Sequence, residues 1–294
     1  MLIDPSMPSC ELCGSESRFY CSKEEARYYR CVKCGLIFQH PLPLLEEMMA
    51  YANDEYTNGL YREYLQARDL KYRMFCERVA ILKEHTNGDR LLDVGCSSGY
   101  LIDAALDAGF DAYGIEGSEV AIAGASERAR RRILQGDVNQ IDMTPYPLYH
   151  VITAFDIIEH TLNPTAFLKR LNELLSPGGI LAITTPDADH FLRALMGRRW
   201  PMLQPFQHTF IFSHSSLQLA LQQNNYDLIE IVPARKLLTP DYLAKQLEIH
   251  NPLISRTYNI ISHALPKKVR NSAIWLNISE MMALAAKPGR KVGS

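Results

Sequence analysis

Residues 90–100, RLLDVGCSSGY, decide the fold of this chain. The largely apolar run Leu91–Val94 breaks at Gly95, and after Gly99 the apolar residues resume with the spacing of a helix. The pattern predicts a strand, a tight glycine turn and a helix. Ligands of open α/β sheets bind outside the carboxyl ends of the strands, and glycine lets a ligand lie against the main chain, so the turn is a candidate nucleotide site.

The next predicted strand ends in an acid that suits a ribose. Residues 111–116, DAYGIE, form a short strand that finishes at Glu116. A carboxylate at this place in an α/β fold typically binds a ribose diol. From Asp93 through Gly95 to Gly99 the motif reads D-x-G-x-x-x-G, which departs from the dinucleotide fingerprint G-x-G-x-x-G and argues against a nicotinamide or flavin enzyme.

These motifs resemble those of the class I S-adenosylmethionine-dependent methyltransferases, which carry D-x-G-x-G-x-G, and Ser97 stands where that family usually has its middle glycine. The resemblance extends over about residues 86–232, because the later strands and helices follow in the family's order. It implies an α/β fold with a Rossmann-like seven-stranded sheet and helical insertions, with S-adenosylmethionine as cofactor. The cofactor-binding residues that it implies are Asp93, Gly95, Cys96, Ser97, Gly99, Glu116, Phe155 and, beside the adenine, Asp137 and Val138.

Composition limits the class of protein. The 294 residues carry 31 basic and 33 acidic side chains and are 47% hydrophobic, enough for one α/β domain and a smaller unit. The near-neutral balance weakens the case for nucleic acid as the main partner. No apolar run approaches the roughly 20 residues of a membrane helix, and the first ten residues lack a signal pattern, so we expect a cytoplasmic protein without a transmembrane segment.

Four of the seven cysteines form two pairs, Cys10-x-x-Cys13 and Cys31-x-x-Cys34, each followed directly by glycine. In a reducing compartment such pairs are metal ligands more often than disulfides, and four thiolates suit tetrahedral zinc. Residues 1–41 are therefore predicted to form a structural zinc ribbon, with free or redox-active thiols as the alternative. The ribbon is interpreted as a structural or substrate-facing cap, and a nucleic-acid-binding role stays open.

The rest of the chain divides at prolines and at changes in periodicity. Pro41 and Pro43 mark a stiff boundary, after which residues 42–85 are predicted to form a helical cap or linker, with helices over 44–52 and 60–84. Residues 86–294 form the predicted methyltransferase domain, with an insertion over 233–278 whose helical runs, 242–249 and 253–265, contribute to an acceptor pocket together with residues 190–207. Trp200 and Trp275 are candidate lining residues.

One predicted helix carries a cluster of arginines. It runs from an N-cap at Ser118 through Arg132, and four arginines fall within residues 128–132. The cluster is either an RNA-binding patch or a solvated helix terminus, where cations favour the negative end of the helix dipole.

The predicted chemistry lies after the apolar strand over residues 149–155. That strand runs into D-x-x-E-H, which resembles the E-x-x-E-H of small-RNA 3′-terminal methyltransferases and ubiquinone-pathway O-methyltransferases, where a divalent metal is bound together with a later histidine. The resemblance implies a second metal site at Asp156, Glu159, His160 and His208. Metal-free catalysis, with His160 or His208 as general base, and a purely structural role are the alternatives.

The sequence thus predicts a methyltransferase acting on oxygen of a small-molecule or glycan-type acceptor. The ribbon followed by a methyltransferase domain resembles sugar and natural-product methyltransferases. An RNA methyltransferase, a sugar C-methyltransferase and a non-catalytic binding protein on the same scaffold are the rival hypotheses.

Overall fold

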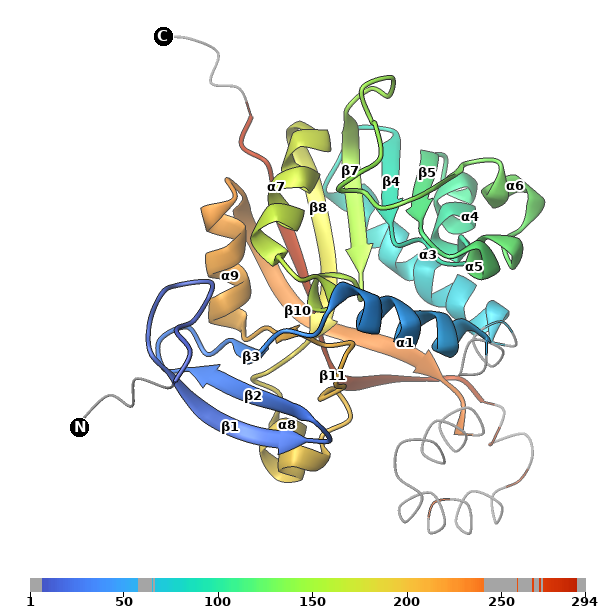
Figure 1. Cartoon of the computed structure of the whole chain (residues 1–294). Coiled ribbons are helices and arrows are strands. Elements are labelled where there is room, and N and C mark those ends of the chain that lie inside the picture. Colours follow the sequence, from blue (N-terminus) through green and yellow to red (C-terminus); the bar gives the residue numbers. More distant parts are fainter. Residues whose placement is uncertain are drawn as a thin grey trace, which may run out of the picture.

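The computed structural model describes residues 7–57, 65, 67–240, 258, 266, 270 and 272–289. They form a seven-stranded sheet of order β10-β11-β8-β7-β4-β5-β6 and a four-stranded sheet of order β1-β2-β3-β9 (Figure 1). In the larger sheet β6, β5, β4, β7 and β8 are parallel, and β11 and β10 complete it as antiparallel strands. The predicted Rossmann-like fold with a seven-stranded sheet is confirmed.

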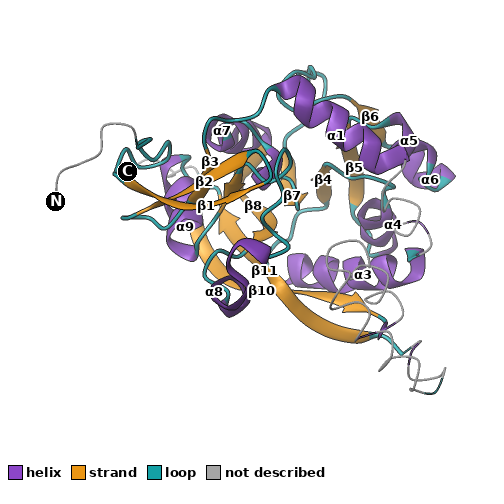
Figure 2. Ribbon diagram, turned by 60° about the horizontal axis from the view of Figure 1, so that its bottom comes forward, coloured by secondary structure: helices purple, strands orange, loops and turns teal. Residues whose placement is uncertain are grey.

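The strands of the larger sheet are apolar because both of its faces are covered. Alternate residues of β7 serve the two faces: Ile152 belongs to the core under α7 and α9, whereas Val151 belongs to the core under α3 and α4. Figure 2 shows these helix pairs on opposite sides of the sheet. The strands are β4 (Arg90–Val94), β5 (Asp111–Glu116), β6 (Ile133–Gln135), β7 (Tyr149–Phe155), β8 (Leu175–Pro186), β10 (Asp227–Leu238) and β11 (Ile274–Ala286).

The helices follow the predicted order. Ser118 caps α5 by accepting a hydrogen bond from the Ala121 amide, as predicted, and Ser213 forms a reciprocal capping box at α9. The α-helices are α1 (Leu45–Thr57), α3 (Arg68–Glu84), α4 (Tyr100–Asp107), α5 (Glu119–Ala123), α6 (Glu127–Arg130), α7 (Pro164–Leu174), α8 (Phe191–Met196) and α9 (His214–Gln223), with short 3-10 turns η1 (Ile158–His160) and η2 (Gly197–Arg199).

The small sheet joins the cysteine-rich segment to the rest of the molecule. Its strands are β1 (Ser17–Lys23), β2 (Ala26–Cys31), β3 (Ile37–Gln39) and β9 (Phe210–Ile211). The first three are the predicted ribbon, but β9 comes from the part of the chain that follows β8 and pairs with β3. Cys31, Leu36 and Phe38 also share one apolar core with Phe210. The ribbon is therefore built into the fold, not appended to it.

One predicted helix has different bounds in the structure. The single helix predicted over 118–132 is two helices, because Ser126 starts a second N-cap by accepting from the Ala129 amide. Strand β6 ends at Gln135, before Gly136 with its φ of 151°. Strand β8 also includes residues 176–179, although they contain a proline and two glycines.

The predicted insertion over 233–278 is too wide. Strands β10 and β11 stay paired from Asp227↔Ala286 to Leu238↔Ile274, so residues 233–238 and 274–278 are strand. Sequence alternation alone did not reveal how far this long hairpin reaches beyond the sheet. The helical runs predicted at 242–249 and 253–265 lie outside the described residues, as does the start of the helix predicted from residue 60.

Within the described part of the chain, no helix combines the length and the apolar character that crossing a membrane requires.

Candidate active site

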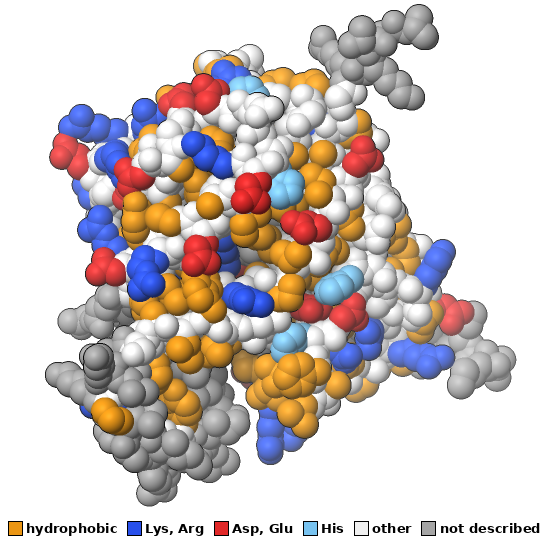
Figure 3. All heavy atoms as spheres, turned by 180° about the vertical axis from the view of Figure 1, so that it is seen from behind, with side chains coloured by type: hydrophobic (Ala, Val, Ile, Leu, Met, Phe, Trp, Pro, Cys, Tyr) orange, Lys and Arg blue, Asp and Glu red, His pale blue; other side chains and the backbone are white. Residues whose placement is uncertain are grey.

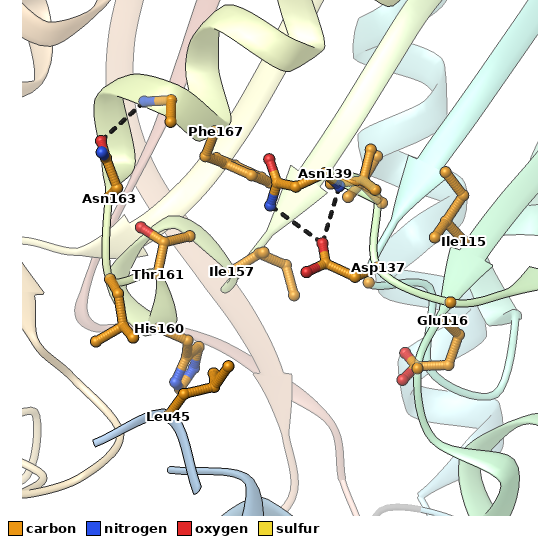
Figure 4. Close-up of a pocket in the computed structure, with 17 residues that line it drawn as sticks. Leu45, Ile115, Glu116, Asp137, Asn139, Ile157, His160, Thr161, Asn163 and Phe167 are labelled. Carbon is orange, nitrogen blue, oxygen red and sulfur yellow. Dashed lines mark hydrogen bonds between the residues drawn. The ribbon is translucent and has the colours of Figure 1, made fainter. Parts of the chain in front are cut away.

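A cavity of about 450 Å³ opens at the carboxyl ends of β4, β5 and β6, where the sequence predicted the cofactor. Glu116 and His160 lie at opposite sides of it, and Ile157 and Asp137 lie between them (Figure 4). Four predicted cofactor residues line this cavity: Gly95, Glu116, Asp137 and Val138. The apolar walls come from Leu45, Val94, Ile115, Ile157, Leu162, Ala166 and Phe167.

Glu116 ties the glycine turn to the end of β5. One carboxylate oxygen accepts a hydrogen bond of 2.8 Å from the Ser97 amide, and the other accepts one of 2.8 Å from the Ser118 amide. Because the side chain is only 8% exposed, these charge-assisted bonds fix its position. Each oxygen keeps a lone pair for a ligand hydroxyl.

The glycine turn has the backbone that the motif implies. Gly95 has a φ of 73°, and a Cβ there would lie 2.1 Å from Cδ1 of Ile157, so only glycine lets this part of the cavity wall close. Ser97 has a φ of 47°, a left-handed conformation that costs a side-chain-bearing residue about 1 kcal/mol or more. This explains why the related motif usually carries glycine at that position.

The other predicted cofactor residues support the turn from behind and do not line the cavity. Asp93 is buried and accepts a 2.7 Å hydrogen bond from Thr153, and burial raises the pKa of Asp93 to about 7. The Cys96 thiol is buried in the core, next to the space that a Cβ on Gly114 would fill. Gly99 lets α6 approach, since a Cβ on it would meet the Ala129 methyl at 2.8 Å.

Phe155, also predicted to contact the cofactor, belongs to an aromatic stack behind β7. Its ring lies parallel to that of Phe75 at 6.4 Å, and the Arg78 guanidinium lies 4.8 Å from its centre. Arg78 is 6% exposed. Sequence reasoning did not identify this arginine because α3 meets β7 only in three dimensions.

Asp137 occupies the rim of the cavity. It is exposed, and Oδ1 accepts hydrogen bonds from the Asn139 amide at 2.9 Å and from the Asn139 side chain at 3.1 Å (Figure 4). Val138 beside it is buried. A carboxylate next to an apolar wall suits the amino group and the face of a purine.

A second cavity, of about 420 Å³, adjoins the first at His160, which lines both. Its polar lining includes Asp156, Glu159, His208, Lys71, Lys236 and Glu280, and its apolar lining includes Leu192, Met196, Trp200, Met202, Leu238 and Ile278. Residues 190–207, predicted to build the acceptor pocket, thus supply one wall. Trp200 is fully buried within that wall, as expected, whereas Trp275 is not among the lining residues.

Three of the four residues predicted to bind a second metal come together. The candidate ligand atoms of Glu159, His160 and His208 all lie within 4.8 Å of one another. His160 Nδ1 faces the Gln207 carbonyl at 3.1 Å, and His208 Nδ1 faces the Met202 carbonyl at 2.7 Å. A ring that donates from Nδ1 carries its lone pair on Nε2, the tautomer of a metal-binding histidine.

Burial keeps the two histidines of this cluster neutral, which is the form that binds a metal ion. Burial lowers the pKa of His208 to about 3 and lowers the pKa of His160, so both rings are neutral at pH 7. Burial raises the pKa of Glu159 well above its ordinary value, and one of its oxygens finds no hydrogen-bond partner among the described residues. A cation would satisfy that oxygen and restore the carboxylate.

Asp156 does not join this cluster. The Thr184 hydroxyl donates to one oxygen at 2.7 Å, and the Lys236 ammonium lies 3.3 Å from the other. Burial alone would raise the pKa of Asp156, but Lys236, Arg78 and Lys71 together hold that pKa below its usual range. Lys236 also pairs with Glu280, which is 4% exposed.

The cysteine set fits zinc. The Sγ atoms of Cys10 and Cys34 are 3.7 Å apart, those of Cys13 and Cys31 are 3.4 Å apart, and those of Cys13 and Cys34 are 3.7 Å apart. Four thiolates at about 2.3 Å from a tetrahedral ion lie about 3.8 Å from one another. Gly14 and Gly35 both take the positive φ that brings each pair of thiols together.

The arginine cluster is largely neutralised by neighbouring acids, and in the rear view basic and acidic side chains are interspersed on the face that the structure describes (Figure 3). The arginines thus fit the alternative of a solvated helix terminus better than an RNA-binding patch, and ion pairs with neighbouring acids hold most of them. The pairs are Arg128 with Asp103 and Asp107, Arg131 with Glu127, and Arg132 with Asp111.

Comparison with known proteins decides the family. A family model described as "Methyltransferase domain" matches residues 61–231, more than half of the chain and all of the cofactor cavity except Leu45. The chain belongs to this methyltransferase family. It is an S-adenosylmethionine-dependent methyltransferase.

Relatives of this methyltransferase include ubiquinone biosynthesis O-methyltransferases. One from Rhodopseudomonas palustris strain TIE-1 is 28% identical over 204 residues, which cover 68% of this chain and 80% of the relative. Another, from strain HaA2, is 32% identical over 142 residues, which cover 46% of this chain and 55% of the relative. Magnesium protoporphyrin IX methyltransferase from Synechocystis PCC 6803, solved with bound SAH, shares the fold with a TM-score of 0.53, at 14% identity and with 81% of this chain and 99% of that chain covered.

Proposed function

We propose that this methyltransferase transfers a methyl group to a hydroxyl oxygen of a small-molecule acceptor, with a divalent cation held by Glu159, His160 and His208. The observation that carries the proposal is the position of His160, which lines both cavities. A donor in the first cavity and an acceptor in the second meet beside this residue. The relatives named as O-methyltransferases support oxygen as the acceptor atom.

The first cavity is the proposed S-adenosylmethionine site. Glu116 accepts the ribose hydroxyls, and Asp137 accepts the adenine amino group against the apolar side chain of Val138. The Gly95 backbone leaves room for the amino acid part of the cofactor. Asp93, Ser97 and Gly99 hold the turn in shape, and Cys96 and Phe155 are packing residues in this assignment.

The second cavity is the proposed acceptor site. It combines charged side chains with apolar side chains from α8, the loop that follows, the end of β10 and the interior of β11. This combination suits a compact acceptor that carries a hydroxyl on an apolar or aromatic frame. Because its wall is less polar than sugars require, we favour a phenol-like acceptor over a glycan.

A cation bound at the cluster would supply Lewis acidity that lowers the pKa of an acceptor hydroxyl. The residues of the cluster supply its ligands: both imidazoles stay neutral, and Glu159 contributes one negative charge toward the cation. Asp156 stays ionised beside the acceptor. A histidine with a pKa of about 3 is a weak general base at pH 7, so ligation fits His208 better than proton abstraction. The acceptor hydroxyl releases its proton to solvent, and its oxygen forms a bond to the methyl carbon as the carbon–sulfur bond breaks and the sulfonium leaves as a thioether.

The four cysteines are the proposed ligands of a structural zinc ion, since their spacing in space matches a tetrahedral thiolate site. This zinc ion would be a second ion, distinct from the cation at Glu159, His160 and His208.

The test compares His208→Gln with the control His214→Gln, an exposed histidine on α9. Mn²⁺ binding, S-adenosylmethionine binding and turnover with a panel of phenols and monosaccharides are measured. We expect His208→Gln to weaken Mn²⁺ binding and lower turnover by more than about tenfold, with cofactor affinity unchanged. Full turnover in protein that holds its zinc but no second cation would refute the cation's role and leave the metal-free alternative.

A further inference from the structure

The segment that carries His208 is held by the cysteine ribbon. We call residues 202–212 the His208 arm. Its end, β9, is the fourth strand of the ribbon's sheet, through the pairs Ile37↔Ile211 and Phe38↔Phe210. The ribbon and the segment that carries His208 therefore share one hydrogen-bonded sheet.

Thr209 connects that sheet directly to Glu159. The Gln39 amide donates to the Thr209 carbonyl at 2.9 Å, and the Thr209 amide donates to the Glu159 carbonyl at 2.9 Å. The Thr209 hydroxyl contacts the carbonyls of Glu159 at 3.0 Å and of Thr161 at 2.7 Å. Thr209 is fully buried, so these bonds have no solvent to replace them.

The other end of the His208 arm is also tied to the ribbon. The Lys23 ammonium, on β1, donates to the Leu203 carbonyl at 2.6 Å. The neighbouring Met202 carbonyl is the one that orients His208. Beyond the arm, the Ser213 hydroxyl donates to the Cys34 carbonyl at 2.6 Å. Both ends of the arm are thus bonded to the ribbon, one through Lys23 and the other, just beyond the arm, through Cys34.

A segment as small as the ribbon takes much of its stability from the ion that its thiolates bind. The cofactor cavity is different, because Glu116 and the glycine turn are held by β4, β5 and their helices. Loss of the ribbon's order should therefore reach the His208 arm and spare the cofactor site.

We propose that the ribbon positions the acceptor-side cluster: zinc on Cys10, Cys13, Cys31 and Cys34 orders the His208 arm, and Thr209 transmits that order to Glu159. Thr209 is a positioning residue in this scheme. The inference rests on the proposed function only in its cation readout. It assigns the ribbon a role in the chemistry beyond that of a stabilising appendage.

The first experiment uses Thr209→Val, which removes the hydroxyl with little change of volume, and Thr209→Ser, which keeps it. Mn²⁺ is the probe, because it prefers oxygen and imidazole ligands and leaves the thiolate site to zinc. We expect Thr209→Val to weaken Mn²⁺ binding by about 10- to 100-fold. Thr209→Ser should keep the Mn²⁺ affinity within about threefold of the wild-type value. The S-adenosylmethionine affinity should be unchanged in both variants. Wild-type Mn²⁺ affinity in folded Thr209→Val overturns the proposal.

The second experiment removes zinc from the full chain and follows amide hydrogen exchange. We expect faster exchange over residues 202–212 and unchanged protection over residues 90–116. Unchanged protection of the arm, equal loss in both segments, or the absence of zinc from the purified protein overturns the proposal. If the wild-type chain takes up no Mn²⁺, the cation part of the proposed function fails, and the exchange experiment still decides the role of the ribbon.

Discussion

Replacing Lys236 with methionine tests the charge balance among the ionised side chains that line the second cavity. Lys236 pairs with Glu280, whose side chain is 5% exposed, and lies 3.3 Å from Asp156, whose side chain is 39% exposed. Methionine keeps most of the volume and removes the charge. The variant therefore leaves one deeply buried carboxylate and one partly solvated carboxylate without their shared cation.

The expected loss of stability comes mainly from Glu280. Removing one partner of a buried ion pair costs about 3–5 kcal/mol, because the other charge stays buried. The partly exposed Asp156 adds at most about 1 kcal/mol, since solvent screens it and the Thr184 hydroxyl remains. We expect the free energy of unfolding to fall by about 3–5 kcal/mol at pH 8.

The loss should shrink as the pH falls. Burial raises the pKa of Glu280 above its ordinary value, so its ionised form opposes folding, and protonation relieves that burden as the pH falls through the folded pKa. Without Lys236 this pKa rises further, and the pKa of Asp156, which Lys236 helps to depress, rises too. The variant should therefore regain stability relative to the wild type between pH 8 and pH 5.

Urea unfolding at pH 8 and pH 5 measures both effects. The control is Lys169→Met, at an exposed lysine on α7, which should change stability by no more than about 0.5 kcal/mol. Lys236→Met/Glu280→Gln should recover most of the loss, because the buried charge is gone. A loss below about 1 kcal/mol, or an equal loss at both pH values, would show that Lys236 does not neutralise Glu280.

Two further predictions concern the cofactor side. Glu116→Ala removes the acceptor of the Ser97 and Ser118 amides. In calorimetry it should weaken S-adenosylmethionine binding by about 1.5–3 kcal/mol, or about 10- to 150-fold, whereas the control Glu119→Ala on α5 should leave the affinity unchanged. Equal affinity in both variants would mean that Glu116 does not face the ribose. Gly114→Ala should destabilise the fold by about 1–3 kcal/mol, because the added Cβ would lie 2.6 Å from the Cys96 sulfur. Adding Cys96→Ala to this variant should recover part of the lost stability, and Cys96→Ala alone should leave the cofactor affinity intact. Weaker cofactor binding in Cys96→Ala alone would place Cys96 in the cofactor site.

Local pattern was sufficient for the order of the strands and for the glycine turn after β4. The predicted bounds of β5 and β7 agree with the structure, as does the cap at Ser118, because alternation, apolar runs and capping depend on neighbours in sequence. The cysteine spacing also predicted a set of four thiols that the fold brings together. The residue-by-residue cofactor roles remain predictions, and the structure separates those that line the cavity from those that support it.

What the sequence by itself determined is the family and the order of the elements, since the motifs that show them are each encoded within a few consecutive positions. Only the tertiary structure decided that Asp156 turns to Lys236 and leaves the other three predicted ligands, and that strand β9 enters the ribbon's sheet. These contacts join residues that lie about 50 to 170 positions apart, so no local pattern specifies them. They arise from packing and from the need to pair every buried charge and backbone amide.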